Sequence, residues 1–267
     1  MTIELDNIYD MDCLEGMRQM ENECVDLTVT SPPYDDRRKY NGYSFDFENI
    51  ARELYRVTKP GGVVVWVVVD ATIDGDETGT SFRQALFFKE CGFKLHDTMI
   101  YNKGCQGAVG NNNGYWQSFE YMFVFSKGRP KTINLICDRQ NVESRVDFNS
   151  TKRQQDGSLK KTNGYSYGKQ GRRTNIWRYY TGKNLTTKDQ IAFKHPAMFP
   201  EALAQDHIRS WSNEGDVVLD PFMGSGTTAK LARAMNRHYI GFEISAEYCD
   251  IIRQRLEQTR SLFDCDK

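Results

Sequence analysis

The sequence predicts an α/β fold with a largely parallel sheet, interrupted by an insertion of different composition. Segments with strand and helix patterns alternate in residues 1–126 and again in residues 194–267, as in sheets whose strands are joined by helices. The run from Val63 to Val69 is apolar at every position, which is typical of a strand buried on both faces. Residues 127–193 are instead dense in basic residues, Gly, Asn, Gln and Thr, so we expect them to form the insertion.

In the first part, proline and glycine mark where elements end. The β-branched run Val25–Thr30 predicts a strand that stops at Ser31, because the prolines that follow cannot continue a sheet ladder. Apolar residues from Phe47 to Val57 have helical spacing, and Lys59–Gly62 predicts a turn that ends this helix. We also expect strands at Asn7–Asp10, Val63–Val69, Thr98–Tyr101 and Tyr121–Phe125, and helices at Leu14–Met20 and Ser81–Cys91.

After the insertion, the alternation of elements resumes. Asp216–Asp220 predicts a strand that enters the glycine-rich turn Pro221–Thr228. The other expected elements are helices at Pro200–Trp211, Ala229–Met235 and Ala246–Leu256, and a strand at His238–Glu243.

Composition and charge exclude several classes of protein. The 267 residues suffice for one large domain or two modest ones, and 35 basic and 36 acidic residues give a formal net charge of −1. This balance excludes whole-chain disorder and a uniformly basic binder. The seven cysteines form no CxxC pair and the four histidines are scattered, so neither a disulfide framework nor a metal site is indicated. The longest apolar run is too short for a membrane span and no leader opens the sequence, so we expect a cytoplasmic protein.

Charge is unevenly distributed along the chain. Residues 127–190 contain 15 basic and 5 acidic residues, a net charge of +10, which leaves −11 for the rest. Aromatic residues are interleaved with these cations, a combination suited to nucleic-acid contact through phosphates and base stacking. On composition alone, a solvated, loop-rich insertion explains the region equally well. The candidate cations for nucleic-acid contact are Arg153, Lys169, Arg172, Arg173 and Arg178.

The glycine-rich turn predicts a nucleoside site. Gly224 and Gly226 allow the backbone to turn tightly and approach a ligand, and open α/β sheets bind ligands at the carboxyl ends of their strands. Glu243 ends the next strand, 23 residues after Asp220, a spacing typical of an acidic residue that accepts from ribose hydroxyls. The turn has no GK[ST] sequence, so a nucleoside without phosphates fits best. In the alternative, Glu243 only caps a solvent-facing strand end.

The turn from Ser31 to Tyr34 predicts a pocket for a planar amine. Pro32 and Pro33 remove two N–H donors and leave carbonyl oxygens, Ser31 adds a hydroxyl, and Tyr34 adds a ring that can stack. Two acceptors that hold the hydrogens of an exocyclic amine would draw its nitrogen toward sp³ geometry and localise its lone pair. The alternative is a rigid Pro-Pro turn that only ends a strand.

Together these motifs resemble the β class of amino-methylating DNA methyltransferases. In that family a Ser/Asp-Pro-Pro-Tyr catalytic motif comes first, a target-recognition region follows, and the AdoMet-binding FxGxGT motif comes last. The matching segments here are Thr30–Tyr34, the basic region and Asp220–Thr228, with further agreement at Asp12–Leu14, Arg56–Gly62 and Lys194–Glu201. The resemblance covers roughly residues 7–70 and 194–256. It implies a Rossmann-like AdoMet-dependent methyltransferase sheet in circular order: a catalytic half at 1–126, a target-recognition insertion at 127–193 and an AdoMet-binding half at 194–267.

The resemblance also implies roles for the matching residues. Ser31 and the Pro32 carbonyl would hold the target amine in a turn stiffened by Pro33, and Tyr34 would stack on the base. Glu243 would bind the AdoMet ribose, and Asp12 would accept from the adenine amino group of AdoMet. Methyl transfer is direct, so we expect Cys13 and Cys24 to be packing residues and not nucleophiles. The remaining residues expected at the AdoMet site are Cys13, Thr30, Lys194, His195, Pro196, Asp220, Phe222, Gly224, Ser225, Gly226 and Thr227.

The residue before Pro-Pro-Tyr bears on the target base. In this family Ser more often accompanies cytosine N4, and Asp or Asn accompanies adenine N6. Ser31 therefore favours a cytosine-N4 methyltransferase that acts on a base flipped out of double-stranded DNA, with adenine N6 as the alternative. The resemblance is compatible with a homodimer, with a cognate restriction endonuclease, and with a prokaryotic or phage-encoded, nucleoid-associated enzyme that needs AdoMet and no metal.

Three rival interpretations fit the motifs less well. A nicotinamide oxidoreductase leaves Ser31–Tyr34 unexplained. In methyltransferases of ribosomal RNA or protein glutamine, the AdoMet motif normally precedes Pro-Pro-Tyr. A catalytically silent DNA-binding regulator would be expected to have lost Ser31, Tyr34 or Glu243, and all are present.

Overall fold

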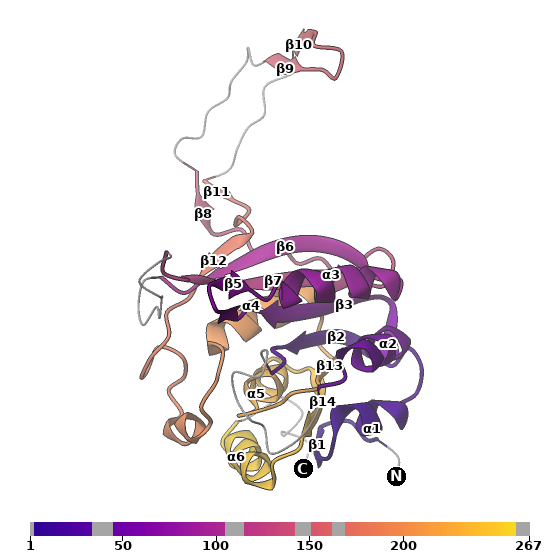
Figure 1. Cartoon of the computed structure of the whole chain (residues 1–267), viewed down its shortest axis with the longest axis vertical. Coiled ribbons are helices and arrows are strands. Elements are labelled where there is room, and N and C mark those ends of the chain that lie inside the picture. Colours follow the sequence, from indigo (N-terminus) through magenta and orange to yellow (C-terminus); the bar gives the residue numbers. More distant parts are fainter. Residues whose placement is uncertain (1–2, 34–44, 105–114, 142–150, 162–168, 260–267) are drawn as a thin grey trace. The chain divides into compact units, whose positions relative to one another are not determined.

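The chain forms two compact units. The computed structural model describes residues 3–33, 45–104, 115–141, 151–161 and 169–259 (Figure 1). The larger unit comprises residues 1–134 and 175–267, and the smaller unit comprises residues 135–174.

An eight-stranded sheet runs through the larger unit in the order β1-β14-β13-β2-β3-β7-β6-β12. The first five strands in this order are parallel to one another, β7 is antiparallel to both β3 and β6, and β12 is parallel to β6. The predicted α/β fold with a largely parallel sheet is therefore confirmed. The strands are β1 (Asn7–Asp10), β2 (Val25–Thr30), β3 (Thr58–Val68), β6 (Lys94–Asn102), β7 (Phe119–Ser126), β12 (Ile176–Arg178), β13 (Val217–Asp220) and β14 (His238–Glu243).

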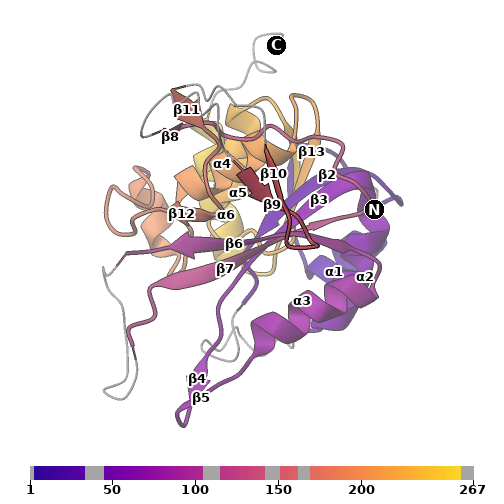
Figure 2. The ribbon, with the colours of Figure 1, turned by 90° about the horizontal axis from the view of Figure 1, so that it is seen from above.

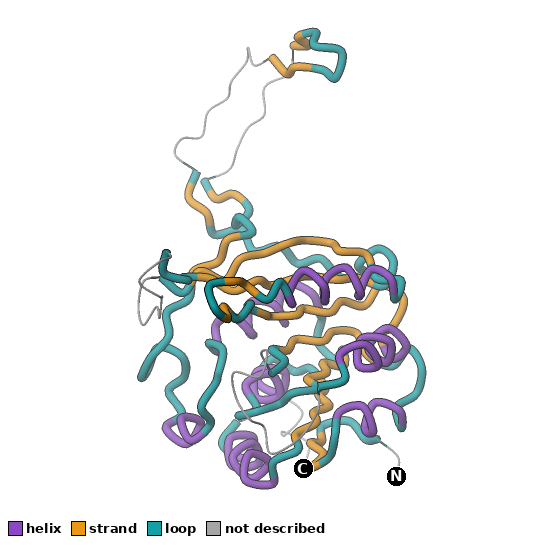
Figure 3. The backbone as a smooth tube through the Cα atoms, viewed as in Figure 1, coloured by secondary structure: helices purple, strands orange, loops and turns teal. Residues whose placement is uncertain are grey.

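Helices cover both faces of this sheet, as Figures 2 and 3 show. One face carries α1 (Cys13–Arg18), α2 (Phe47–Val57) and α3 (Thr80–Glu90), and the other carries α4 (Glu201–Trp211), α5 (Thr227–Ala234) and α6 (Ala246–Glu257). A short 3-10 helix, η1 (Gln190–Lys194), precedes α4, and a small hairpin of β4 (Thr72–Ile73) and β5 (Asp76–Glu77) precedes α3. Among the described residues, no helix has the length and apolar character needed to cross a bilayer.

The core under α2 and α3 follows from the predicted apolar run. Val63–Val69 is buried at every position, as a strand covered on both faces must be. Trp66 is completely buried, and its indole N–H donates to Gln84 Oε1 of α3 at 2.8 Å. This hydrogen bond joins α3 to the sheet inside an apolar cluster and gives the buried indole N–H a partner.

The predicted turn at Lys59–Gly62 does not lie between two elements. The helix ends at Val57 as expected, but Lys59–Gly62 belongs to the first part of β3, where Gly61 has a φ of +83° and the register with β2 shifts between Thr58 and Val63. The Gly61 N–H donates to the Lys127 carbonyl at 2.6 Å, and the Lys127 N–H donates to the Gly62 carbonyl at 3.0 Å. These partners follow β7, so the contacts that hold the segment in the sheet come from a distant part of the chain, where a local pattern cannot reveal them.

The described residues of the smaller unit include two short antiparallel ribbons. β8 (Arg139–Gln140) pairs with β11 (Gln170–Gly171), and β9 (Thr151–Arg153) pairs with β10 (Leu159–Lys161). This unit lies within the predicted insertion, 127–193, but it is narrower, because β12 belongs to the main sheet. Its role in target recognition stays a prediction.

Candidate active site

The predicted catalytic and glycine-rich motifs meet at one edge of the sheet. β2 leads into the Ser31 turn, and its parallel neighbour β13 leads into the glycine-rich turn. β1 and β14 end at the same edge, where Asp10 is paired with Glu243. Because neighbouring parallel strands end together, segments some 190 residues apart in the sequence are neighbours here.

Two hydrogen bonds join the ends of β2 and β13. Thr30 Oγ1 donates to Asp220 Oδ1 at 2.6 Å, and Thr228 Oγ1 donates to the Val29 carbonyl at 3.1 Å. The Phe222 N–H also donates to Asp220 Oδ1, at 3.0 Å. The Asp220 carboxylate therefore ties the strand of the Ser31 turn to the first residues of the glycine-rich turn.

Asp220 is almost completely buried, and this affects its charge. Burial raises the pKa of Asp220 to about 6, against the opposing effect of the Thr30 and Thr228 hydroxyls and the Phe222 N–H. With 1 % of its surface exposed, the side chain offers little area to a ligand. Asp220 acts on the site mainly through the groups that it holds.

The glycine-rich turn has the conformation that its glycines predict. Gly224 and Gly226 have φ values of +53° and +78°, in the left-handed region that favours glycine. A Cβ at Gly226 would lie 2.7 Å from Ile252 Cγ2, and one at Gly224 would lie 3.1 Å from the His195 ring. The turn is therefore packed closely between α6 and the segment that carries His195.

Glu243 is hydrogen-bonded to this turn. Its Oε2 accepts from the Gly224 N–H at 2.8 Å, and its Oε1 accepts from the Ser245 N–H at 3.0 Å. Burial raises the pKa of Glu243, while these N–H groups oppose the shift. Each carboxylate oxygen keeps a second lone pair, so the side chain can hold the turn and also accept from a ligand hydroxyl.

Asp12 and Cys13 follow β1 at the same edge. Asp12 caps α1, since its Oδ1 accepts from the Leu14 N–H at 2.8 Å and from the Glu15 N–H at 3.2 Å. Cys13 is buried, and burial raises the pKa of its thiol. Burial also raises the pKa of the half-buried Cys24 thiol. Both cysteines therefore stay in the thiol form, as packing residues would.

The expected AdoMet-site residues 194–196 differ in their surroundings. His195 is buried, its ring lies edge-on to Tyr248 with centroids 4.4 Å apart, and its Nδ1 accepts from the Ala197 N–H at 3.2 Å. Lys194 and Pro196 are exposed. Only His195 lies against the glycine-rich turn in the described contacts.

Arg255, a buried arginine of α6 that was not among the predicted site residues, is hydrogen-bonded to the glycine-rich turn. Arg255 Nη1 donates to the Ser225 carbonyl at 2.5 Å and lies 3.2 Å from Ser225 Oγ and 3.4 Å from Thr227 Oγ1. Its other nitrogens bind Asp189 Oδ2 at 3.0 Å and Glu201 Oε1 at 2.7 Å. Ser225 and Thr227, both expected at the AdoMet site, are thus anchored to the segment that carries His195.

Lys230 completes this ionic cluster. Its Nζ lies 2.8 Å from Asp189 Oδ2 and 2.7 Å from Glu201 Oε1. Burial alone would raise the pKa of Asp189, but hydrogen bonds from Lys230 and Arg255 bring it below its usual value. Glu201 is the last residue of the family block Lys194–Glu201, and Asp189 precedes the block by five residues. This position in the sequence is the one signal that could have pointed to them.

The Ser31 turn is described as far as Pro33. Pro32 is buried, while Ser31 and Pro33 are half-buried. Tyr34 lies outside the described residues. The Phe222 ring packs on Phe45 and Trp66, with centroid distances of 5.6 Å and 6.1 Å, so this expected AdoMet-site residue also belongs to the aromatic core.

The cations predicted to contact nucleic acid fall into three groups. Arg153, Lys169 and Arg172 are exposed in the smaller unit. Arg173 is already paired, since its Nε lies 3.1 Å and 3.0 Å from the two Asp138 oxygens. Arg178 ends β12 in the larger unit, with its guanidinium 5.0 Å from the centre of the Tyr180 ring.

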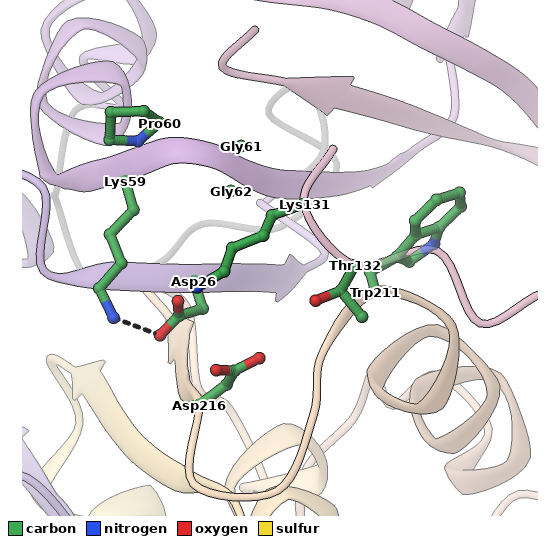
Figure 4. Close-up of a pocket in the computed structure, with 9 residues that line it drawn as sticks. All are labelled: Asp26, Lys59, Pro60, Gly61, Gly62, Lys131, Thr132, Trp211 and Asp216. Carbon is green, nitrogen blue, oxygen red and sulfur yellow. Dashed lines mark hydrogen bonds and ion pairs between the residues drawn. The ribbon is translucent and has the colours of Figure 1, made fainter. Parts of the chain in front are cut away.

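A small cavity of about 40 Å³ lies at the opposite edge of the sheet (Figure 4). Lys59 and Asp26 form an ion pair of 2.6 Å beside it, and the cavity includes none of the predicted site residues. No group of three or more His, Cys, Asp or Glu side chains suited to a metal ion occurs in the described part of the chain.

Comparisons with known proteins agree with one another. The model of the N6/N4 methyltransferase family, described as DNA methylase, matches residues 25–254. The orphan methyltransferase M.BamHII of Bacillus amyloliquefaciens is 60 % identical over 245 residues, which cover 90 % of this chain and 92 % of the relative.

Solved structures share the fold at lower identity. The cytosine-N4-specific PvuII DNA methyltransferase has a TM-score of 0.68 and 21 % identity, over 95 % of this chain and 87 % of that chain. TTHA0409 of Thermus thermophilus, complexed with S-adenosyl-L-methionine, has a TM-score of 0.61 and 23 % identity, over 94 % and 95 % of the two chains.

Proposed function

The chain belongs to the N6/N4 DNA methylase family of AdoMet-dependent methyltransferases, and on this premise we propose that it methylates the exocyclic N4 of a cytosine flipped out of duplex DNA. The observation that carries the proposal is the 2.6 Å hydrogen bond from Thr30 to Asp220, because it joins the strand of the amine-binding turn to the strand of the glycine-rich turn. A methyl donor at one turn can then meet an amino group at the other.

The residues at the edge fit AdoMet. The tight glycine-rich turn presents backbone in place of side chains, and the Glu243 and Asp12 carboxylates suit ribose hydroxyls and the adenine amino group. His195, beside Gly224, would lie toward the methionine end. AdoMet, when bound, supplies a methyl group activated by a positively charged sulfonium, which the acidic side chains of this edge complement.

The Ser31 turn would hold the amine as an acceptor and not as a base. The Ser31 hydroxyl and the Pro32 carbonyl can each accept one of the two amine hydrogens, which directs the nitrogen lone pair toward the donor. Ser31 is neutral and a poor base, so the proton leaves to water after methylation, when the nitrogen is cationic. The neutral, buried Cys13 thiol agrees with direct transfer and no covalent enzyme intermediate.

The smaller unit supports a role in DNA contact. Its β9–β10 ribbon places Lys152 directly opposite Lys160, beside the pair Arg153 and Leu159, and all are exposed. Like charges opposite each other destabilise a ribbon, and a bound polyanion would relieve that repulsion.

The name of M.BamHII as an orphan methyltransferase favours a solitary enzyme over one with a cognate endonuclease.

Transfer from tritiated AdoMet to duplex DNA, followed by identification of the modified base, tests the proposal. We expect N4-methylcytosine, and a loss of about 100-fold in rate for Ser31→Ala, because one acceptor at the reacting amine is removed. N6-methyladenine would overturn the choice of base and leave the family assignment intact. Unlabelled DNA together with intact AdoMet binding would overturn the catalytic proposal.

A further inference from the structure

The antiparallel half of the sheet also ends at the edge of the Ser31 turn. β7 runs opposite to β3, so its first residues lie beside the last residues of β3, with Tyr121 paired to Val68. β6 ends at Asn102, which is paired with Phe119 of β7 and with Arg178 of β12. Because β3 is the parallel neighbour of β2, these three strand ends lie on the same side of the sheet as the amine-binding turn.

The segment that leads into β7 is fixed at this edge. The Lys103 N–H donates to the Ser118 carbonyl at 2.8 Å, and Lys103 Nζ pairs with Glu120 Oε1 at 3.0 Å. This ion pair is mostly shielded, with 26 % and 13 % of the two side chains exposed. Tyr115 and Trp116 directly precede the anchored residues, so they are presented at the rim of the sheet.

Arg178 and Tyr180 form the next part of the same rim. The Arg178 guanidinium lies over the Tyr180 ring, and a Cβ at Gly104 would be 3.4 Å from Arg178 Nη2 and 3.6 Å from Tyr180 Cε1. The ring and the cation are thus packed on the backbone that follows β6. Both side chains remain exposed.

The exposure of Trp116 is unlike that of the other three tryptophans. Trp116 is 64 % exposed and Tyr115 is fully exposed, whereas Trp66, Trp177 and Trp211 are at most 6 % exposed. Large aromatic side chains held open to water beside a catalytic turn mark an interaction surface. Arg178, exposed at the end of β12 on the same side of the sheet, indicates that the partner is anionic.

We propose that Trp116, together with Tyr115, stacks on bases of the bound DNA beside the extruded target base, while Arg178 binds an adjoining phosphate. The inference rests on the proposed function. An extruded base leaves a gap that exposes base faces, and aromatic rings stack on any base whatever its identity. β7 lies two strands from β2, about 10 Å away, and Trp116 precedes β7 by a further ~10 Å of extended chain, so the ring can reach a neighbouring base step. The target base itself would be bound by the Ser31 turn, not by Trp116.

Intrinsic tryptophan fluorescence tests the stacking directly. Because the other tryptophans are buried, quenching on addition of duplex DNA should come from Trp116, and it should vanish in Trp116→Phe. In Trp116→Ala we expect a DNA Kd about 5- to 150-fold higher and an unchanged AdoMet Kd, whereas Trp116→Phe should keep most of the affinity. Leu86→Ala, at a residue 60 % exposed on α3, is the matched control and should leave both constants unchanged.

Quenching that persists in Trp116→Phe, or a DNA Kd within two-fold of wild type in Trp116→Ala, would overturn the inference. A wild-type protein that binds DNA but transfers no methyl group would overturn the proposed function instead. The fluorescence measurement would still decide whether Trp116 stacks, since it needs only DNA binding.

Discussion

Replacement of Arg255 by methionine is the most direct test of how the glycine-rich turn is held. Methionine keeps most of the volume of the side chain but removes the hydrogen bonds that Arg255 itself donates to Ser225, Asp189 and Glu201. The Ser225 carbonyl then loses a buried partner, and two carboxylates lose one of the two cations between them.

The expected cost follows from the burial of the cluster. The Arg255 side chain is 0 % exposed, and those of Asp189 and Glu201 are 21 % and 22 % exposed. Loss of one partner from a buried ion pair costs about 3–5 kcal/mol. Lys230 still binds both acids, so we expect the lower end, a fall of about 3 kcal/mol in the free energy of unfolding. For a chain of this size that corresponds to a Tm lower by roughly 6–12 °C.

Urea unfolding and AdoMet calorimetry would measure both effects. Arg253→Met is the matched control, because Arg253 lies on the same helix in an exposed i,i+3 pair with Asp250. Exposed pairs contribute about 0–1 kcal/mol, so the control should be close to wild type. Arg255→Met should also bind AdoMet more weakly, since the Ser225 turn is released. Equal stability of the two variants would refute the reasoning.

Three further outcomes are expected. Glu243→Ala should weaken AdoMet binding by about 10-fold or more, through loss of charged hydrogen bonds, and leave DNA affinity nearly unchanged; equal AdoMet affinity by calorimetry would contradict the ribose assignment. The double change Lys152→Gln and Lys160→Gln should lower the slope of log Kd for DNA against log salt by about 2, and an unchanged slope would place the phosphates elsewhere. The raised pKa of Asp220 means that its ionisation opposes folding: its stabilising contribution is complete below the unfolded pKa and is lost as pH rises through about 6. Asp220→Asn should therefore flatten the decline in unfolding free energy between about pH 4 and 7, by at most about 3 kcal/mol in urea titrations. A decline identical to that of wild type would be inconsistent with a raised pKa of Asp220.

Local patterns were sufficient for three strands of the parallel half of the sheet. β1, β2 and β14 have the predicted bounds, because each is a short apolar or β-branched run between turn residues. The meeting of the Ser31 and glycine-rich turns could be expected too, since both follow strands of a parallel sheet. Which strands are neighbours could not be read from the periodicity, and it is the pairing of β2 with β13 that brings Thr30 to Asp220.

The residues that were missed are defined by distant contacts. Arg255 lies on an amphipathic helix, where an arginine normally faces water, and only its partners at Asp189 and Glu201 explain its burial. Trp116 presents the opposite case, since a tryptophan is usually expected to be largely buried. Its exposure follows from the antiparallel pairing of β6 and β7, which carries the residues before β7 out at the functional edge.

The order of the sheet places carboxylates beside the glycine-rich turn and an exposed arginine farther along the same edge. Asp12 follows β1, and Asp220 and Glu243 end β13 and β14, on one side of β2, whereas Arg178 ends β12 and Trp116 precedes β7 on the other side. On the proposed function, the carboxylates adjoin the cationic methyl donor, and Arg178 binds a phosphate of the polyanionic DNA. Each of these groups is then opposite in charge to the ligand that it meets, and the Ser31 turn, where the methyl group is transferred, lies between them.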